Sequence, residues 1–203
     1  LIEAAGAHEL AEARRIWAGY FLASIEVDRG ELKAARQRLA ALDASVRKQL
    51  ALSEDDTRLR ETLVAVLRER TVVEAALGER QRALELANAA REASGLLAAM
   101  DSDNLLWQSY HAGALTTRAR LRAEGAQPWP DAAAASEFEA QRERMLKLAL
   151  RAPGSTFVVL AAAEAQRLAG DLVWDDSEIA AMHWHRGLDL LPPTAEQRTP
   201  DEQ

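Results

Sequence analysis

The sequence predicts an all-α fold built from helical hairpins, and three observations support this prediction. Glycines that precede helical segments recur every 47–48 residues, at Gly30, Gly78 and Gly125. Two polar, acidic segments are also 48 residues apart when they are aligned on Asp55 and Asp103. Alanine and leucine dominate the hydrophobic fraction of 48%, and only 5% of the residues are aromatic. A period of this size is typical of stacked helical hairpins, because a single hairpin does not bury its apolar face.

The period predicts one helical repeat domain, residues 1–192, followed by a polar tail, residues 193–203. The four expected hairpins cover residues 2–51, 55–100, 104–151 and 155–190. In the first hairpin the break falls at Asp28–Gly30, where we expect Gly30 to take the left-handed conformation that ends many helices. Among the residues that the first helix is expected to bury are Trp17, Tyr20, Leu22 and Ile25.

Polar segments predict where the later helices begin. Ser53–Asp56 supplies capping oxygens for a helix over 55–76, and Asp101–Asn104 does the same for the first helix of the third hairpin. The apolar residues that follow recur at helical spacing and are expected in the core. They are Leu59, Leu63, Val66, Val73 and Leu77, then Ala83, Leu86, Ala87, Ala90, Ala93 and Leu97, and then Leu106, Trp107, Tyr110, Ala114 and Leu121.

Two irregularities interrupt the period. Pro128 and Pro130 flank Trp129, and because proline disrupts helices they predict a rigid turn before a helix over 131–151. In the last hairpin, helices over 155–169 and 176–190 are joined by a longer link at Gly170–Asp175. We expect the surface that is particular to this protein at these two places.

Composition argues against several classes of function. The net charge of −7, with 32 acidic and 25 basic residues interspersed, disfavours nucleic acid, because that affinity comes largely from lysine and arginine on phosphates. The chain has no cysteine, which excludes disulfides and is compatible with either cytoplasm or periplasm. It contains no run of 18 apolar residues, so we expect this segment not to insert into a membrane.

No group of residues predicts catalysis, a metal site or a cofactor. His183 and His185 are two positions apart and face different sides of a helix, whereas a metal-binding pair needs a spacing of three or four. The carboxylates at Glu54–Asp56 and Asp175–Asp176 stand at helix starts, where capping accounts for them. The sequence has neither a nucleophile elbow nor a glycine-rich phosphate loop. We therefore expect a protein that is not an enzyme.

Small residues at fixed positions resemble the pattern of the tetratricopeptide-repeat (TPR) family. That family places a glycine near the end of its first helix, a small residue five positions later, another seven further on, and a proline after the second helix. The matching residues are Gly30 and Ala35, with Leu42 in the second small position; Gly78, Ala83 and Ala90; and Ala180, Gly187 and Pro192. The string Arg167–Asp171 resembles the usual turn between the two helices of a unit.

The string Asp103–Gln108 resembles a phrase found in long-period TPR regions of bacterial multidomain proteins, among them membrane-attached kinases and transcriptional regulators. TPR units usually have about 34 residues, so the longer period implies longer helices. HEAT-type repeats match the length better, but their Pro/Asp/Arg pattern is absent. The resemblance implies a non-enzymatic scaffold that binds a protein or peptide. The alternatives are a sensor or regulatory segment of a larger bacterial kinase or regulator and, third, an all-α enzyme.

The resemblance also implies a partner groove lined by the first helix of each hairpin, suited to an extended peptide or an acidic terminus. Its expected solvent-side residues are Arg60, Glu61 and Arg68 in the second hairpin and Gln108, His111 and Arg118 in the third. Arg60 and Gln108 are equivalent at the 48-residue offset. Trp129 is a further candidate, because tryptophan is enriched in binding hot spots; packing back onto the array is its alternative role. The tryptophans inside helices are expected to pack between helices: Trp17, Trp107 and Trp184.

The two ends of the chain carry a further expectation. The N-terminal helix is apolar at Leu1, Ile2, Trp17 and Phe21, and the end of a repeat array exposes apolar surface unless a polar helix covers it. Either the sequence is cut through an array or this helix mediates dimerisation. The chain begins without methionine and ends in a polar tail that contains proline, which predicts a fragment of a longer protein.

Overall fold

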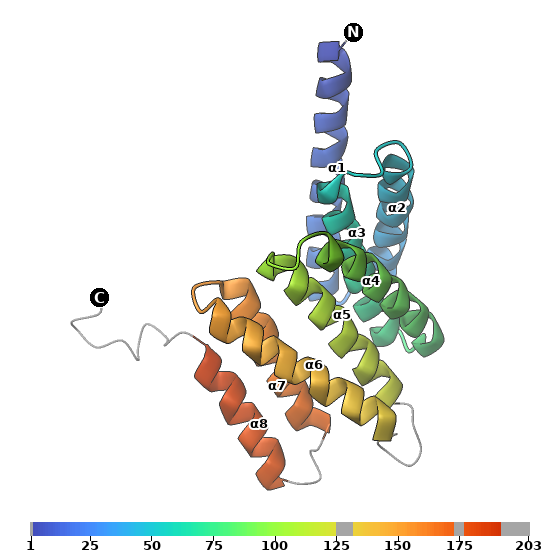
Figure 1. The fold of residues 1–203 in the computed structure, drawn as a ribbon. Helices are drawn as coiled ribbons and strands as arrows, with labels where there is room; N and C mark the ends of the chain where they lie inside the picture. Colours follow the sequence, from blue (N-terminus) through green and yellow to red (C-terminus); the bar gives the residue numbers. More distant parts are fainter. Residues whose placement is uncertain (1, 125–131, 173–176, 192–203) are drawn as a thin grey trace, which may run out of the picture. The chain divides into compact units, whose positions relative to one another are not determined.

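The computed structural model describes residues 2–124, 132–172 and 177–191, and helices are the only regular secondary structure in them, which confirms the all-α prediction. Its helices, shown in Figure 1, are α1 (Ile2–Asp28), α2 (Leu32–Leu50), α3 (Thr57–Ala76), α4 (Arg80–Met100), α5 (Leu105–Ala123), α6 (Ala132–Arg151), α7 (Thr156–Leu172) and α8 (Ser177–Leu190). Contacts divide the chain into two compact units, Leu1–Asp101 with α1–α4 and Ser102–Gln203 with α5–α8. Within each unit, helices that follow one another in sequence pack as pairs. A single domain over 1–192 stays a prediction.

Side-chain caps begin α3 and α5 where the sequence predicts them. The Asp56 carboxylate accepts hydrogen bonds from the backbone N–H groups of Arg58, at 2.9 Å, and Leu59, at 3.1 Å. The Asn104 side-chain oxygen accepts one from the N–H of Trp107 at 3.2 Å. Each bond satisfies an N–H group that has no partner within the first turn of its helix.

Glycine conformation explains where two of the helices end. Gly30 and Gly78 have φ angles of 74° and 81°, in the left-handed region that favours glycine, and this confirms the expectation for Gly30. Gly170, by contrast, lies inside α7, which continues to Leu172. The prediction that a link begins at Gly170 is therefore wrong, and Arg167–Asp171 is helix rather than a turn. The other expected irregularity, Gln127–Pro130, lies outside the described residues.

The first unit has a core of alanine, valine and leucine. In it α2 packs against α1 and α3, and α3 also packs against α4. The largest fully buried leucines are Leu39 on α2, Leu67 on α3 and Leu97 on α4. Most core residues expected on α3 and α4 are buried, including Leu63, Val66, Val73, Ala83, Leu86, Ala87 and Ala90.

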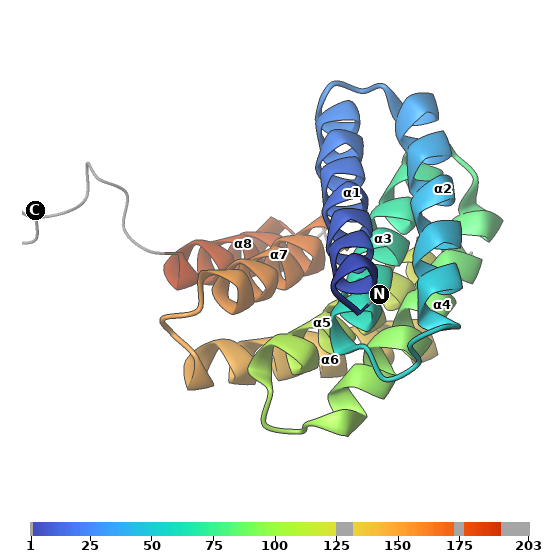
Figure 2. The same ribbon diagram turned by 90° about the horizontal axis from the view of Figure 1, so that it is seen from above.

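The buried face of α1 differs from the expected one. Ile16 and Ala23, two turns apart, are buried, whereas Trp17, Leu22 and Ile25 are exposed. Figure 2 shows α1 beside α2, which is the main neighbour of α1 in this unit. Because α1 carries apolar residues around much of its circumference, helical spacing alone does not indicate which side faces α2.

The exposed side of α1 carries a cluster of aromatic rings. The Trp17 ring lies 5.9 Å from the Tyr20 ring, centroid to centroid, and 6.0 Å from the Phe21 ring. Phe21 is 60% exposed. These contacts are within one helix, and Trp17 is 42% exposed, so it is not buried as expected.

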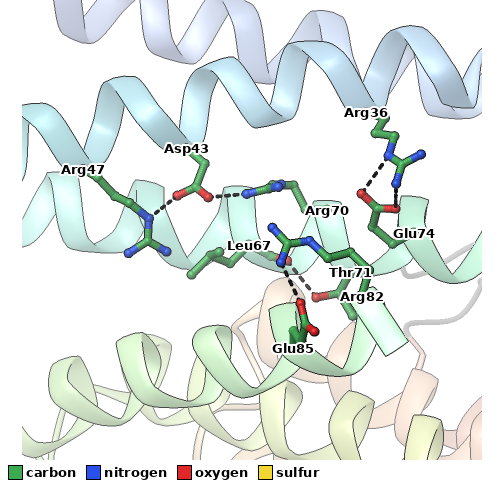
Figure 3. A network of polar contacts seen from close by, with 9 residues as sticks. All are labelled: Arg36, Asp43, Arg47, Leu67, Arg70, Thr71, Glu74, Arg82 and Glu85. Atoms are coloured by element: carbon green, nitrogen blue, oxygen red, sulfur yellow. Dashed lines mark hydrogen bonds and ion pairs between the residues drawn. The ribbon is translucent and has the colours of Figure 1, made fainter. Parts of the chain in front are cut away.

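Ion pairs connect α2 to α3 at two places, as Figure 3 shows. Asp43 on α2 accepts a hydrogen bond from Arg47 Nε at 2.6 Å and forms an ion pair with Arg70 on α3. About one turn from Arg70, the buried Glu74 accepts a hydrogen bond from Arg36 Nε at 3.0 Å. The Asp43 and Arg70 side chains are both largely buried. Because buried charges need their partners, these pairs fix how α2 and α3 are aligned along their axes.

In the second unit α7 packs against α5, α6 and α8. Its main apolar cluster joins three of these helices: Ala112 of α5; Met145, Leu148 and Ala149 of α6; and Val158, Val159, Ala162 and Ala165 of α7. On α5, Ala114 and Leu121 are buried as expected, but Leu106 is exposed. Small and polar residues, including Ser109 and Thr116, occupy part of the buried face of α5, so apolar spacing alone does not identify that face.

Candidate functional site

An apolar groove of about 350 Å³ lies between α7 and α8 in the second unit. We call it the α7–α8 groove; it is lined by Leu160, Ala163, Glu164 and Arg167 from α7 and by Trp184, Gly187, Leu188 and Leu191 from α8 and its end. Leu160, Trp184 and Leu188 remain exposed, and Leu188 is 63% exposed. Large apolar side chains gathered around a hollow are typical of binding surfaces.

The Trp184 ring forms one wall of this groove and is held in place within the hairpin. Its Nε1–H donates a hydrogen bond to Asp171 Oδ1 at 3.2 Å. The ring lies against Gly170, where an added Cβ atom would come within 2.3 Å of the indole nitrogen. Trp184 therefore contacts α7, as expected, yet it stays partly exposed. A side chain that is already fixed loses less conformational entropy when a partner binds.

Two buried contacts beneath the groove hold α8 close to α7. A Cβ atom on Gly187 would lie 3.1 Å from the Ala163 carbonyl oxygen, so glycine allows the two backbones to approach. One turn earlier on α8, His183 Nδ1 lies 3.1 Å from Gln166 Oε1, and both side chains are buried. These contacts fix the positions of Trp184 and Leu188 relative to α7.

The charged residues beside the groove are paired with one another. Arg167 donates to both carboxylate oxygens of Glu164, at 2.7 Å each, and also to Asp171. The hydrogen bonds and charges of these carboxylates raise the pKa of Arg167 despite its partial burial. Two carboxylates around one guanidinium leave one negative charge at this edge, while the floor of the groove is apolar.

Gly170→Ala is expected to displace the Trp184 ring from its place in the groove wall. The new methyl group would overlap the indole, but the ring sits at the end of a rotatable side chain, so the unfolding free energy should change by less than about 1 kcal/mol. The ¹H–¹⁵N signal of the Trp184 indole, assigned with Trp184→Phe, measures the shift. Gly154→Ala is the matched control, because its Cβ atom would meet no other atom within 4 Å. An unchanged indole signal in Gly170→Ala would contradict this account.

A pH dependence is expected from His183. Burial lowers the pKa of His183; Arg142 on α6 and Arg186 on α8 lower this pKa further, and Glu139 opposes them. The unfolded chain therefore takes up a proton on this side chain more readily than the folded protein does. The contribution of neutral His183 to stability is present above its ordinary pKa of 6.5 and is lost as the pH falls below that value.

Urea unfolding at pH values on either side of 6.5 tests this expectation. His183→Gln should weaken the loss of stability at the lower pH, while His185→Gln, which changes an exposed histidine on the same helix, should leave it intact. Equal pH dependence in His183→Gln and the wild type would show that His183 makes no such contribution.

The partner-binding residues predicted on α3 lie in the first unit. Arg60 is half-buried, and its Nε and Nη2 donate to the Glu54 carbonyl oxygen at 3.0 and 2.6 Å. It also lines a hollow of about 330 Å³ at the α2–α3 connection. Glu61 and Arg68 are half-buried too. Burial raises the pKa of Glu69, and the charge of Arg68 opposes this rise.

The residues predicted on α5 lie in the second unit. Gln108 is only 8% exposed, and its side-chain oxygen accepts a hydrogen bond from Arg144 Nη2 on α6 at 2.7 Å. The expectation that Gln108 lies on the solvent side is therefore wrong, because the α5–α6 interface covers it. His111 and Arg118 are half-buried, and Trp129 lies outside the described residues. A role for these residues in binding stays a prediction.

The described helices contain no group of three or more histidines and carboxylates that could hold a metal ion. Over the same residues, no helix is both long enough and apolar enough to cross a bilayer. The chain matches no protein-family model, and neither a curated protein nor a solved structure is similar to it. The candidate site therefore rests on the geometry of α7 and α8.

Helical spacing alone does not identify the α7–α8 groove. The groove residues Trp184 and Leu188 of α8 and Leu191 after it are four and three positions apart, and the buried residues Ala180, His183 and Gly187 show a similar spacing of three and four. The contact between Trp184 and Gly170 is the feature that distinguishes the sets, and it depends on how α8 packs on α7.

Proposed function

We propose that this chain is a non-enzymatic protein-interaction module that binds a protein or peptide partner in the α7–α8 groove. The observation that carries the proposal is an exposed tryptophan fixed in the wall of an apolar hollow. Tryptophans of this kind are enriched among residues that dominate interface energies, and surrounding leucines exclude water from the contact. The lining has the mixture of apolar and paired charged groups that partner surfaces use.

Helical hairpins of the TPR type are part of this proposal. The small residues that match the TPR pattern support it, because they are buried. They are Ala35, Ala83, Ala90, Ala180 and Gly187. Gly30 and Gly78 also have the left-handed backbone expected at turns between paired helices. Arg167–Asp171 departs from the pattern because it is helical.

Affinity capture with three forms of the chain tests the proposed function. Leu188→Glu places a carboxylate in the groove, and Leu150→Glu makes the same change at a 77% exposed leucine of α6 that does not line the groove. A genuine partner should be retained by the wild type and by Leu150→Glu and lost by Leu188→Glu. If all three forms retain the same proteins, the groove is not the binding site.

The exposed face of α1 supports association of two copies as a second role. Trp17, Phe21 and Ile25 are exposed and recur every four residues, so they form one stripe on the helix. We expect Phe21→Glu to weaken self-association, because a buried carboxylate without a partner is costly. Sedimentation equilibrium over a range of concentrations measures it, with Leu52→Glu as the exposed control. A wild-type chain that stays monomeric throughout would exclude this role.

A further inference from the structure

The α7–α8 groove is placed where a third helix could dock. The α7 residues that line it differ from Val158, Ala162 and Ala165, which pack in the core with α5 and α6. Its α8 residues span Trp184 to Leu191, about 10 Å at 1.5 Å per residue. A channel between two paired helices, with side chains spaced by three and four, matches the ridge of side chains on another helix.

The packing of α8 also favours a helix as the occupant. Among the described helices of this unit, α8 packs chiefly on α7, whereas α7 has three helical neighbours. On the groove side of α8, Trp184 and Leu188 remain exposed. Stacked hairpins bury such a surface by adding the next helix. A partner helix would take the place that a neighbouring repeat takes elsewhere in such arrays.

The charge around the groove indicates which kind of helix fits. The described residues of the α7–α8 hairpin, 156–172 and 177–191, contain four carboxylates and two arginines, a formal charge of −2. The carboxylates are Glu164, Asp171, Glu178 and Asp189. Complementary charge on a partner strengthens the encounter and fixes its orientation.

We propose that the α7–α8 groove binds a basic amphipathic helix of a partner protein, which packs a bulky apolar side chain against Trp184 and Leu188. Its lysines and arginines face the acidic hairpin. The proposal rests on the proposed function and names the chemistry of the partner. Apolar contact supplies the affinity, and charge selects basic helices over acidic ones.

Two synthetic helices test the proposal against the full chain. One peptide places leucine on one face and lysine on the other, and the second peptide replaces every lysine with glutamate. In fluorescence-anisotropy titrations we expect the lysine peptide to bind at least about tenfold more tightly than the glutamate peptide, and less tightly as salt is added. Equal affinity for the two peptides would overturn the proposal.

Substitutions separate binding in the groove from general attraction between opposite charges. Leu188→Glu adds a negative charge, which by itself would strengthen binding of the lysine peptide. We nevertheless expect at least a tenfold loss of affinity, because the groove loses its apolar contact. Leu150→Glu adds the same charge away from the groove and should bind at least as tightly as the wild type. If both variants bind alike, the attraction is unspecific and the proposal fails.

A separate double variant tests whether the acidic residues of the hairpin contribute to binding of the lysine peptide. Glu178→Gln with Asp189→Asn removes two negative charges at exposed positions of α8. This double variant should bind the lysine peptide several-fold more weakly at low salt and equally at high salt. Unchanged affinity at low salt would show that the acidic residues do not select the partner.

The outcomes distinguish this proposal from the proposed function. If a partner is captured in a way that depends on Leu188 but the lysine peptide does not bind, the proposed interaction module stands and the proposal of a basic helix as its partner is wrong. Binding of a small apolar dye in the groove, lost in Leu188→Glu and without peptide binding, would instead indicate a small-molecule pocket and overturn both.

Discussion

Asp43→Ala is expected to destabilise the first unit by about 3 kcal/mol, the largest effect that we predict for a single polar side chain. Asp43 pairs with Arg70 across the α2–α3 interface, where both side chains are largely buried. Removing the carboxylate leaves the Arg70 guanidinium in a poorly solvated place with no opposite charge. Urea unfolding followed by circular dichroism measures the change.

Glu85→Ala is the matched control for this experiment. Glu85 pairs with Arg82 on α4 at 2.7 Å, as Figure 3 shows. Both side chains are about half exposed. Exposed pairs contribute less than about 1 kcal/mol. Adding Arg70→Met to Asp43→Ala should restore part of the loss, since no unpaired charge then remains. Equal costs for Asp43→Ala and Glu85→Ala would contradict the buried role of Asp43.

Leu67→Ala is expected to cost about 2–5 kcal/mol of unfolding free energy. Leu67 is among the largest fully buried side chains of the first unit, so its truncation removes apolar contacts and leaves a cavity.

Leu52→Ala makes the same substitution in the connection between α2 and α3, where the leucine is 76% exposed. Its effect should stay within about 0.5 kcal/mol. Hydrogen exchange of the α3 amides in both variants shows which part of the helix loses protection. A Leu67→Ala protein as stable as Leu52→Ala would mean that α3 is not packed as described.

Helix positions could be predicted closely because the signals that end helices are local. Asp56 and Asn104 cap their own helices, and Gly30 and Gly78 take the left-handed conformation that glycine adopts more readily than other residues. Such interactions span only a few residues, so the sequence near each end is sufficient. The predicted end at Gly170 was wrong because a glycine can also serve a neighbouring helix, here by leaving room for Trp184.

The buried faces were harder to predict where a helix is apolar on more than one side. On α1, Ile16 and Ala23 face the core while Trp17 and Ile25 do not, and the choice depends on the position of α2. On α5 the polar Gln108 is buried because Arg144 of α6 satisfies its oxygen. Both outcomes depend on contacts between helices that periodicity within one helix does not contain.

The candidate site also depends on contacts between helices. The polar residues predicted on α3 and α5 include side chains that bind within their own unit, such as Arg60 with the Glu54 carbonyl oxygen. The groove instead combines residues of α7 and α8, among them Leu160 and Leu188, which are 28 positions apart. Only the packing of the hairpin brings them together.

The contact between Gly170 and Trp184 has a consequence for how this hairpin can change in evolution. The indole occupies the space that a side chain at position 170 would need, so the two positions are not free to vary independently. In related sequences, a residue larger than alanine at 170 should be accompanied by a smaller side chain at 184. Position 171 should then also lose its preference for aspartate, because the hydrogen bond to the indole disappears with the ring. Positions 170, 171 and 184 should therefore change together. Related proteins with such a larger residue at 170 should bind different partners, because their groove lacks the tryptophan wall.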